Sequence, residues 1–372
     1  MGPAGSNAGA LFFLLYPGRR RRRAVAAGNG GKDMKIVVDI FGADHAPAET
    51  VKGAALALTR DETLHLVLTG DQKAIEAELA RCECDRSRIE IVDAPEVITC
   101  DESPTAAIRV KKNSSLVVAC ELLKNRGDIA AMVSAGSTGA VLSGAIFKVG
   151  RLKGVLRPAL APVLPTLKGS DVCLVDCGAN VDCKPEYLVQ FALMGMSYIR
   201  AVYGIVNPRV ALVSVGTEDE KGNELTKEVF KRLKSLDINF VGNMEARDAL
   251  SGDYDVLVAD GFVGNVLLKS AEGTAKMVMK LLKNGIMSST MSKVGALFMK
   301  KTFNRLKDEM DYNKKGGAPL LGIEKVVVKA HGSSNAESFA VAILQAAKMA
   351  EGGITTGITD ELDKLAAAES HD

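Results

Sequence analysis

Short apolar runs rich in β-branched residues alternate with longer segments in which apolar residues recur every three or four positions. The short runs predict strands and the longer segments predict helices, such as 104–124 and 184–202. This alternation predicts an α/β fold, with a mainly parallel, doubly wound sheet and helices on both faces. The predicted strands are Lys35–Ile40, Leu64–Thr69, Arg88–Val92, Ile129–Val133, Ala159–Leu164, Val172–Val175, Arg209–Val213, Asn239–Gly242, Val256–Ala259 and Lys325–Lys329.

Five of these strands end in a short loop rich in Gly, Asn, Ser and Asp that opens a helix. In a parallel sheet such loops gather at the carboxyl ends of the strands, where ligands bind. Glycine lets backbone N–H groups approach a ligand, and helix N-termini favour anions. The pattern therefore predicts a small anionic ligand, with inorganic phosphate as the leading candidate. The five polar loops are residues 39–47, 134–139, 176–185, 260–265 and 331–335.

No loop contains a P-loop or a clean G-x-G-x-x-G motif, so nucleotide binding through those devices is unsupported. In the last loop, Ser334 and Glu337 have capping-box spacing. The candidate phosphate- or substrate-binding residues in these loops are Gly42, Asp44, Gly136, Ser137, Gly139, Asp182, Gly264, His331, Gly332, Ser333 and Asn335.

The catalytic candidates are donors and cations rather than nucleophiles. No G-x-S-x-G elbow is present. Lys184 precedes a predicted helix, where the helix dipole disfavours a cation unless it serves an anion; a solvated surface Lys is the alternative. Asn180 and Asn265 offer amide donors, with a simple turn role as the alternative. For His331 a buried, hydrogen-bonded role is favoured over acid/base chemistry.

Composition narrows the function classes. Aromatic residues make up 5% of the chain and Trp is absent, which argues against nucleic-acid binding by base stacking. Seven Cys without a C-x-x-C pair and only four His predict no metal site and no cofactor, and they favour free thiols in a reducing, cytoplasmic compartment. Cys177 and Cys183 are interpreted as small buried hydrophobes.

The first 33 residues differ from the rest. They hold five Arg, one Lys and one Asp, so the remaining chain is mildly acidic although the whole carries +2. We interpret residues 1–33 as a disordered extension before a catalytic domain at 34–365, with residues 366–372 as a tail. A lipid-touching anchor is the alternative for the extension, whose apolar run is too short to span a bilayer.

A second unusual segment is 276–307, which holds eight Lys or Arg and no Asp or Glu, interleaved with Met and other apolar residues. Such a helical region lies on an anionic membrane surface or binds an acidic protein, unless it is a solvated face over the core. Its candidate contact residues are Lys293, Lys300 and Lys301.

From residue 34 to about 365 the sequence resembles the bacterial phosphate acyltransferase family (PlsX). The resemblance rests on motifs that occur together in order. They are the loops already described and Arg157–Ala161, Asn207–Val210, Gly216–Gly222 and Gly316–Gly322. Two positions depart from the family pattern: Ala43 stands where Gly is usual, and Ser137 stands where Asn is frequent.

The resemblance implies transfer of a fatty acyl group from acyl carrier protein to inorganic phosphate, giving acyl phosphate for phospholipid synthesis. It also implies a homodimer, a Rossmann-like fold related to phosphotransacetylases and isocitrate dehydrogenases, peripheral membrane contact, and delivery to a membrane-bound glycerol-3-phosphate acyltransferase. On this basis we expect Lys184 and Asn265 to handle phosphate and developing charge, with Asn180, Gly264 and the backbone near Gly139 completing the cradle. The alternatives are an NAD-dependent dehydrogenase of related fold and a non-catalytic module that docks carrier protein or membrane.

Overall fold

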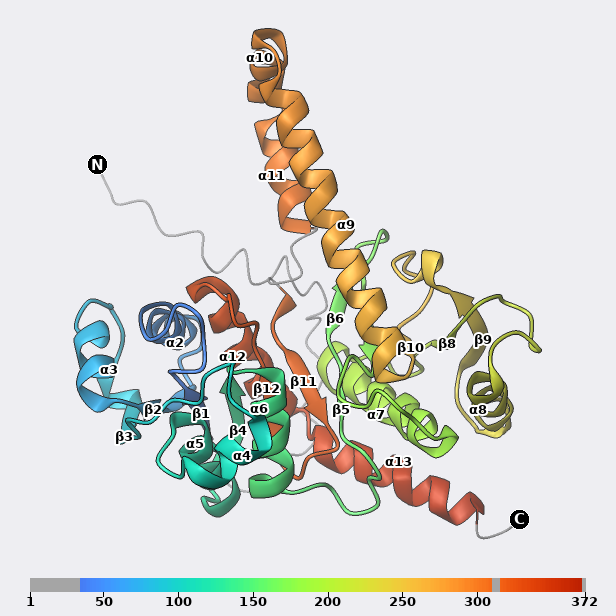
Figure 1. Cartoon of the computed structure of the whole chain (residues 1–372), viewed down its shortest axis with the longest axis horizontal. Coiled ribbons are helices and arrows are strands. Elements are labelled where there is room, and N and C mark those ends of the chain that lie inside the picture. Colours follow the sequence, from blue (N-terminus) through green and yellow to red (C-terminus); the bar gives the residue numbers. More distant parts are fainter. Residues whose placement is uncertain (1–33, 310–314, 370–372) are drawn as a thin grey trace.

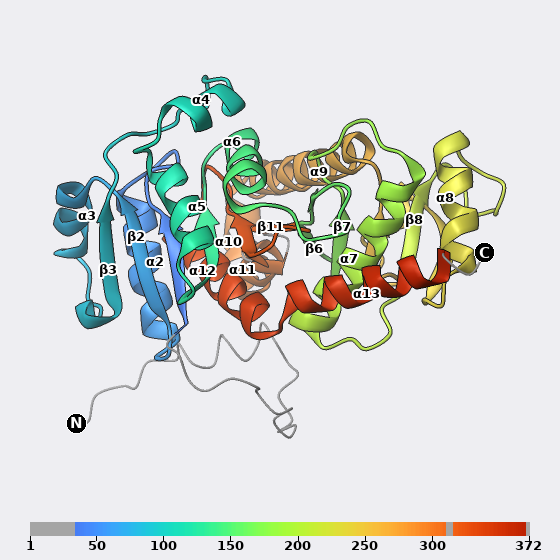
Figure 2. The ribbon, with the colours of Figure 1, turned by 90° about the horizontal axis from the view of Figure 1, so that it is seen from below.

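The computed structural model describes residues 34–309 and 315–369, and it contains two sheets side by side (Figures 1 and 2). The larger sheet has seven strands in the order β3-β2-β1-β4-β12-β11-β5, and the first five are parallel. Its strands are β1 (Lys35–Asp39), β2 (His65–Gly70), β3 (Ile89–Asp93), β4 (Ile129–Ser134), β5 (Ala159–Leu160), β11 (Ala318–Leu321) and β12 (Val326–Lys329).

The smaller sheet has five strands in the order β6-β7-β10-β8-β9, of which only β6 is antiparallel to its neighbour. Its strands are β6 (Val163–Pro165), β7 (Asp171–Val175), β8 (Val210–Ser214), β9 (Phe240–Glu245) and β10 (Val256–Val258). The prediction of a mainly parallel sheet with helices on both faces is confirmed, but the strands divide between two sheets rather than one.

Helices cover both faces of the sheets (Figure 2). One continuous core joins the two halves, because residues of β1, β7, β8 and β10 pack with α7, α12 and α13 in a single cluster. The helices are α2 (Ala48–Arg60), α3 (Gln72–Leu79), α4 (Pro104–Val110), α5 (Ser115–Asn125), α6 (Thr138–Gly144), α7 (Pro185–Tyr203), α8 (Glu224–Ser235), α9 (Gly261–Met287), α10 (Thr290–Phe298), α11 (Lys300–Glu309), α12 (Ala336–Glu351) and α13 (Ile354–Glu369), with short turns at Arg86–Arg88, Ala145–Val149 and Ala246–Asp248.

Two predicted elements differ from the structure, and one strand was not predicted. The run 159–164 is not one strand: β5 closes the larger sheet and β6 opens the smaller one. The predicted helix 104–124 is interrupted, because Ser114 caps α5 by accepting from the N–H of Val117 at 3.4 Å. The strand β11 was not predicted. It is short, contains Pro319 and pairs antiparallel to both of its neighbours.

The basic, Met-rich segment 276–307 stands away from the body. The outer part of α9 projects from the two sheets, and α10 and α11 fold back along it (Figure 1). Large apolar side chains here are exposed, including Met291 at 83% and Phe298 at 87%. No helix in the described ranges is long and apolar enough to cross a membrane. The predicted extension at 1–33 and the last residues of the predicted tail, 370–372, lie outside the described part, while α13 continues past Leu365 to Glu369.

Candidate functional site

A row of polar side chains crosses the larger sheet where four parallel strands end. Thr69, Asp39, Ser134 and Lys329 occupy registered positions on β2, β1, β4 and β12. The Ser134 hydroxyl donates to Asp39 Oδ2 at 2.6 Å and accepts from the N–H of Gly136 at 3.0 Å. Burial raises the pKa of Asp39, while hydrogen bonds to its carboxyl act in the opposite direction. This network fixes the path of the loop that follows β4.

The three polar loops of the larger sheet touch one another. A Cβ built on Gly42 would lie 2.5 Å from the backbone nitrogen of Gly136, so the first two loops approach too closely for a side chain there. The N–H of Asp44 donates to the carbonyl of Gly332 at 2.9 Å and joins the first loop to the last. Ala43, the first departure from the family pattern, is accommodated as a partly buried residue packed against the core.

The two polar loops of the smaller sheet form a second unit around Asp176. Its buried carboxylate accepts from the N–H groups of Leu160, Cys177, Ala179 and Asn180 and from the Asn180 amide, at 2.6–3.3 Å. Burial is the main cause that raises the pKa of Asp176, and these hydrogen bonds oppose the rise. The N–H of Gly261 donates to Asn180 O at 2.7 Å, so both loops are held together.

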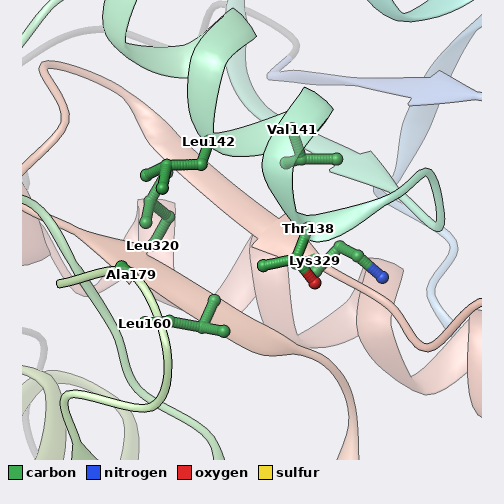
Figure 3. A pocket seen from close by; sticks show the side chains of 7 residues that line it. All are labelled: Thr138, Val141, Leu142, Leu160, Ala179, Leu320 and Lys329. Carbon is green, nitrogen blue, oxygen red and sulfur yellow. The ribbon is translucent and has the colours of Figure 1, made fainter. Parts of the chain in front are cut away.

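Elements of both sheets line one small hollow at the junction of the sheets (Figure 3). Thr138 comes from the start of α6, Ala179 from the loop after β7, and Lys329 from the end of β12. The remaining wall is aliphatic: Val141, Leu142, Leu160 and Leu320. The hollow has a volume of about 10 Å³, roughly the space of one water molecule. Inorganic phosphate, the ligand predicted from the sequence, is larger than this space.

The three predicted catalytic residues do not line this hollow. The Asn180 amide donates to Pro158 O at 2.8 Å and to Asp176, so both of its hydrogens hold the fold. Lys184 is exposed at the residue before α7, and Asp182 is also exposed. Asn265 is exposed near the start of α9, which begins at Gly261, so most of the predicted loop 260–265 is helical; a Cβ on Gly178 would lie 3.7 Å from the Asn265 side chain.

The last loop corrects two expectations. His331 is hydrogen-bonded as predicted, with Nδ1 accepting from the N–H of Ser333 at 3.2 Å, but it is exposed rather than buried. Partial desolvation of the ring and nearby Lys329 lower the pKa of His331. The capping-box prediction is wrong, because Asn335 rather than Ser334 caps α12 by accepting from Ser338 N–H at 2.9 Å.

In the loop 134–139, the candidates Ser137 and Gly139 have structural roles. The Ser137 hydroxyl accepts from Ala140 N–H at 3.3 Å and caps α6. A Cβ on Gly139 would lie 2.7 Å from Pro104, so glycine is required where α4 meets α6. The shorter Ser137 side chain is therefore sufficient for the cap that this position supplies.

The cysteines near the site are protonated at neutral pH. Burial raises the pKa of Cys177 well above its ordinary value and raises the pKa of Cys183 to about 11. A thiol attacks only as the thiolate, so neither group is poised as a nucleophile. Among the described residues no group of three or more His, Cys, Asp or Glu is arranged to hold a metal ion.

Sequence reasoning missed two features of this edge. Lys329 was treated only as the end of a strand, although a Lys that closes an otherwise apolar parallel strand is itself a signal. A sixth polar loop, 215–223, follows β8 beside β10, so it lies at the same edge as the loop after β10. This loop carries the exposed Lys221 and served only as a motif in the resemblance.

Sequence comparison relates the chain to known proteins over most of its length. The family profile described as "Fatty acid synthesis protein" matches residues 34–356. A phosphate acyltransferase of Clostridium acetobutylicum is 49% identical over 332 residues, which cover 89% of this chain and all of that protein. The chain belongs to the phosphate acyltransferase family. A second phosphate acyltransferase, from Clostridioides difficile, is 47% identical over 89% of this chain and 97% of that protein.

Comparison with solved structures shows which known fold the chain shares. A phosphotransacetylase from Streptococcus pyogenes matches with a TM-score of 0.58 and 20% identity, over 86% of this chain and 95% of that one. The predicted relation to phosphotransacetylase folds is therefore confirmed. Because the family consists of phosphate acyltransferases, the chain is assigned as an enzyme of this transferase type, which displaces the dehydrogenase and docking-module alternatives.

Two glycines of α9 test how tightly the loops around Asp176 fit. A Cβ on Gly264 would lie 1.9 Å from Asp176 O, whereas nothing lies within 4 Å of a Cβ on Gly273. We expect Gly264→Ala to destabilise the protein by more than about 2 kcal/mol, because backbone must move. Gly273→Ala is the matched control and should stabilise by up to about 1 kcal/mol, since Ala favours helix. Urea unfolding of both variants measures the difference, and equal stabilities would contradict the described packing.

Proposed function

We propose that the protein transfers a fatty acyl group from the thioester of acyl carrier protein to inorganic phosphate and so supplies acyl phosphate for phospholipid synthesis. The observation that carries the proposal is one hollow lined from both sheets, by Thr138 after β4, Ala179 after β7 and Lys329 at the end of β12, beside polar loops that contact one another within each sheet. Membership of a phosphate acyltransferase family supports the reaction class. The site offers positioning and charge stabilisation, which suit a substrate that is itself the nucleophile.

The reaction needs no covalent enzyme intermediate. A phosphate oxygen attacks the thioester carbonyl carbon, the carbonyl oxygen takes up negative charge, and the C–S bond then breaks. The thiol has an ordinary pKa near ~8.5, so the departing sulfur needs little help from an acid. Hydrogen-bond donors are needed where the oxyanion forms. In this proposal Lys184 and Asn265 supply donors from the loops around Asp176, and Asn180 positions those loops through its bonds to Pro158 and Asp176.

The projecting helices α9 to α11 suit the partners that this reaction requires. Lys276, Lys280 and Lys283 are exposed and spaced four and three residues apart, so they share one face of α9. Such a face complements an acidic carrier protein, and the exposed apolar side chains at Met291 and Phe298 suit a lipid surface. We include peripheral contact with an anionic membrane, transfer of product to a membrane-bound glycerol-3-phosphate acyltransferase, and a homodimer in the proposal.

The direct test follows thiol release from acyl carrier protein with and without inorganic phosphate. We expect release only when phosphate is present, with acyl phosphate as the product. Lys184→Ala should lower the rate on the order of tenfold to a thousandfold if Lys184 is a charge-stabilising donor. Lys227→Ala, which removes an exposed Lys of α8, is the control and should leave the rate unchanged. A near-normal rate for Lys184→Ala refutes its assigned role, and thiol release that ignores phosphate refutes the function.

Charge reversal tests the projecting helices. Lys293, Lys300 and Lys301 are all exposed, and changing them to Glu should weaken binding both to acyl carrier protein and to vesicles containing anionic lipid. Wild-type binding to either partner should also fall as salt is raised. The same changes at Lys52, Lys73 and Lys112, which are exposed on the body, control for overall charge. Equal affinities for both triple variants would remove the projecting helices from the proposal.

A further inference from the structure

We infer that Lys329 is the group that binds the phosphate anion in this site, which extends the proposed function and rests on it. The sequence pointed instead to Lys184, the residue before α7. The two lysines differ in their surroundings: Lys184 is exposed, whereas Lys329 is partly buried and lines the hollow between the sheets.

The position of Lys329 follows from strand register. It is the last residue of β12 and pairs in register with Ser134, which in turn pairs with Asp39. The residues before it in β12, Val326, Val327 and Val328, are buried. The strand therefore brings one ammonium to the edge where the loops 39–47, 134–139 and 331–335 meet. In Figure 3 its nitrogen points away from the aliphatic wall of the hollow.

The ammonium is held without a carboxylate in direct contact among the described residues. Its described hydrogen bond goes to the neighbouring carbonyl of Ala330. The charged and titratable groups that face it are Asp39 on β1, Asp44 in the loop after β1, Lys269 on α9, Cys100 before α4 and His331. A cation removed from water with few opposite charges nearby destabilises the folded protein, unless an anion binds beside it.

Burial of the Lys329 ammonium changes how the stability of the folded protein depends on pH. Burial lowers the pKa of Lys329 from 10.5 to about 8, although the charges of Asp44 and Asp39 oppose the change. Between pH 8 and 10.5 the unfolded chain binds more protons than the folded chain, so the penalty is complete below pH 8 and falls as pH rises. Residues kept at the expense of stability are typical of functional sites. A bound dianion would restore the charged state and offset the penalty.

The first test measures stability without substrate. Lys329→Met keeps an unbranched side chain that is one heavy atom shorter and removes the charge. We expect the variant to melt at a higher temperature than wild type at pH 7, with the difference shrinking towards pH 10. Lys325→Met is the matched control, because Lys325 precedes the same strand at its opposite end. It should show no such pH-dependent gain. A Lys329→Met variant that melts lower than wild type at pH 7 would overturn the inference.

The second test measures binding of inorganic phosphate by equilibrium dialysis. Lys329→Met should weaken affinity at least about tenfold, whereas Lys325→Met should leave it unchanged. Wild-type affinity should fall as pH rises through 8, because the free ammonium loses its proton. Lys329→Arg keeps its charge at every pH used, so its affinity should lack that decline. Equal affinities for wild type and Lys329→Met, or the same pH profile for wild type and Lys329→Arg, would refute the role of Lys329.

The same preparations separate this inference from the proposed function. If wild type binds phosphate in a Lys329-dependent way but forms no acyl phosphate from an acyl thioester, the binding role stands and the reaction fails. If wild type forms acyl phosphate and Lys329→Met keeps the wild-type affinity for phosphate, the reaction stands and the role of Lys329 fails.

Discussion

The buried carboxylate of Asp176 is the contact on which the geometry of the site depends. A carboxylate removed from water is strongly destabilising unless it is compensated, and here several donors converge on it. One donor, the N–H of Leu160, belongs to β5 of the larger sheet, while Asp176 follows β7 of the smaller sheet. The same side chain therefore orders the loop after β7 and joins it to the edge of the other sheet. Together with the Cys177 N–H, which donates to Leu160 O at 3.0 Å, this link fixes the loop after β7 against β5.

Local features of this fold could be predicted from sequence because their causes are local. A parallel strand buried on both faces requires an apolar run, and the turn that follows requires Gly, Asn or Asp; both signals lie within ten residues. The division into two sheets could not be predicted in this way. The run 159–164 is uniformly apolar, and only its pairing with β11 on one side and β7 on the other divides it into β5 and β6. The partner β11 is distant in sequence, and the partner β7 is as apolar as the run itself, so the local sequence does not show where the run divides.

The sequence predicted which polar loops lie close together, but not how the individual side chains in them are oriented. The sequence identified the loops that meet, but the direction of an amide or ammonium is set by neighbours from other elements. The Asn180 amide could donate hydrogen bonds to a ligand, but both of its hydrogens bind Pro158 O and Asp176. Lys184 was selected from the sequence because it precedes a helix. Lys329 ends a strand, and its place beside the polar loops depends on the pairing of β12 with β4 and of β4 with β1, which the sequence does not show.

The hollow has a volume of only about 10 Å³, and its construction limits how it can widen. Separation of the two sheets would break the bonds of Asp176 and would also split the core that α7 shares with both halves. Burial of apolar area on that scale makes such a movement expensive. The wall that contains Lys329 and Thr138 is different, because it ends in loops whose residues Asp44, His331 and Ser333 are exposed. Movement of these loops and of the flexible Lys329 side chain would therefore widen the hollow at much lower cost than separation of the two sheets.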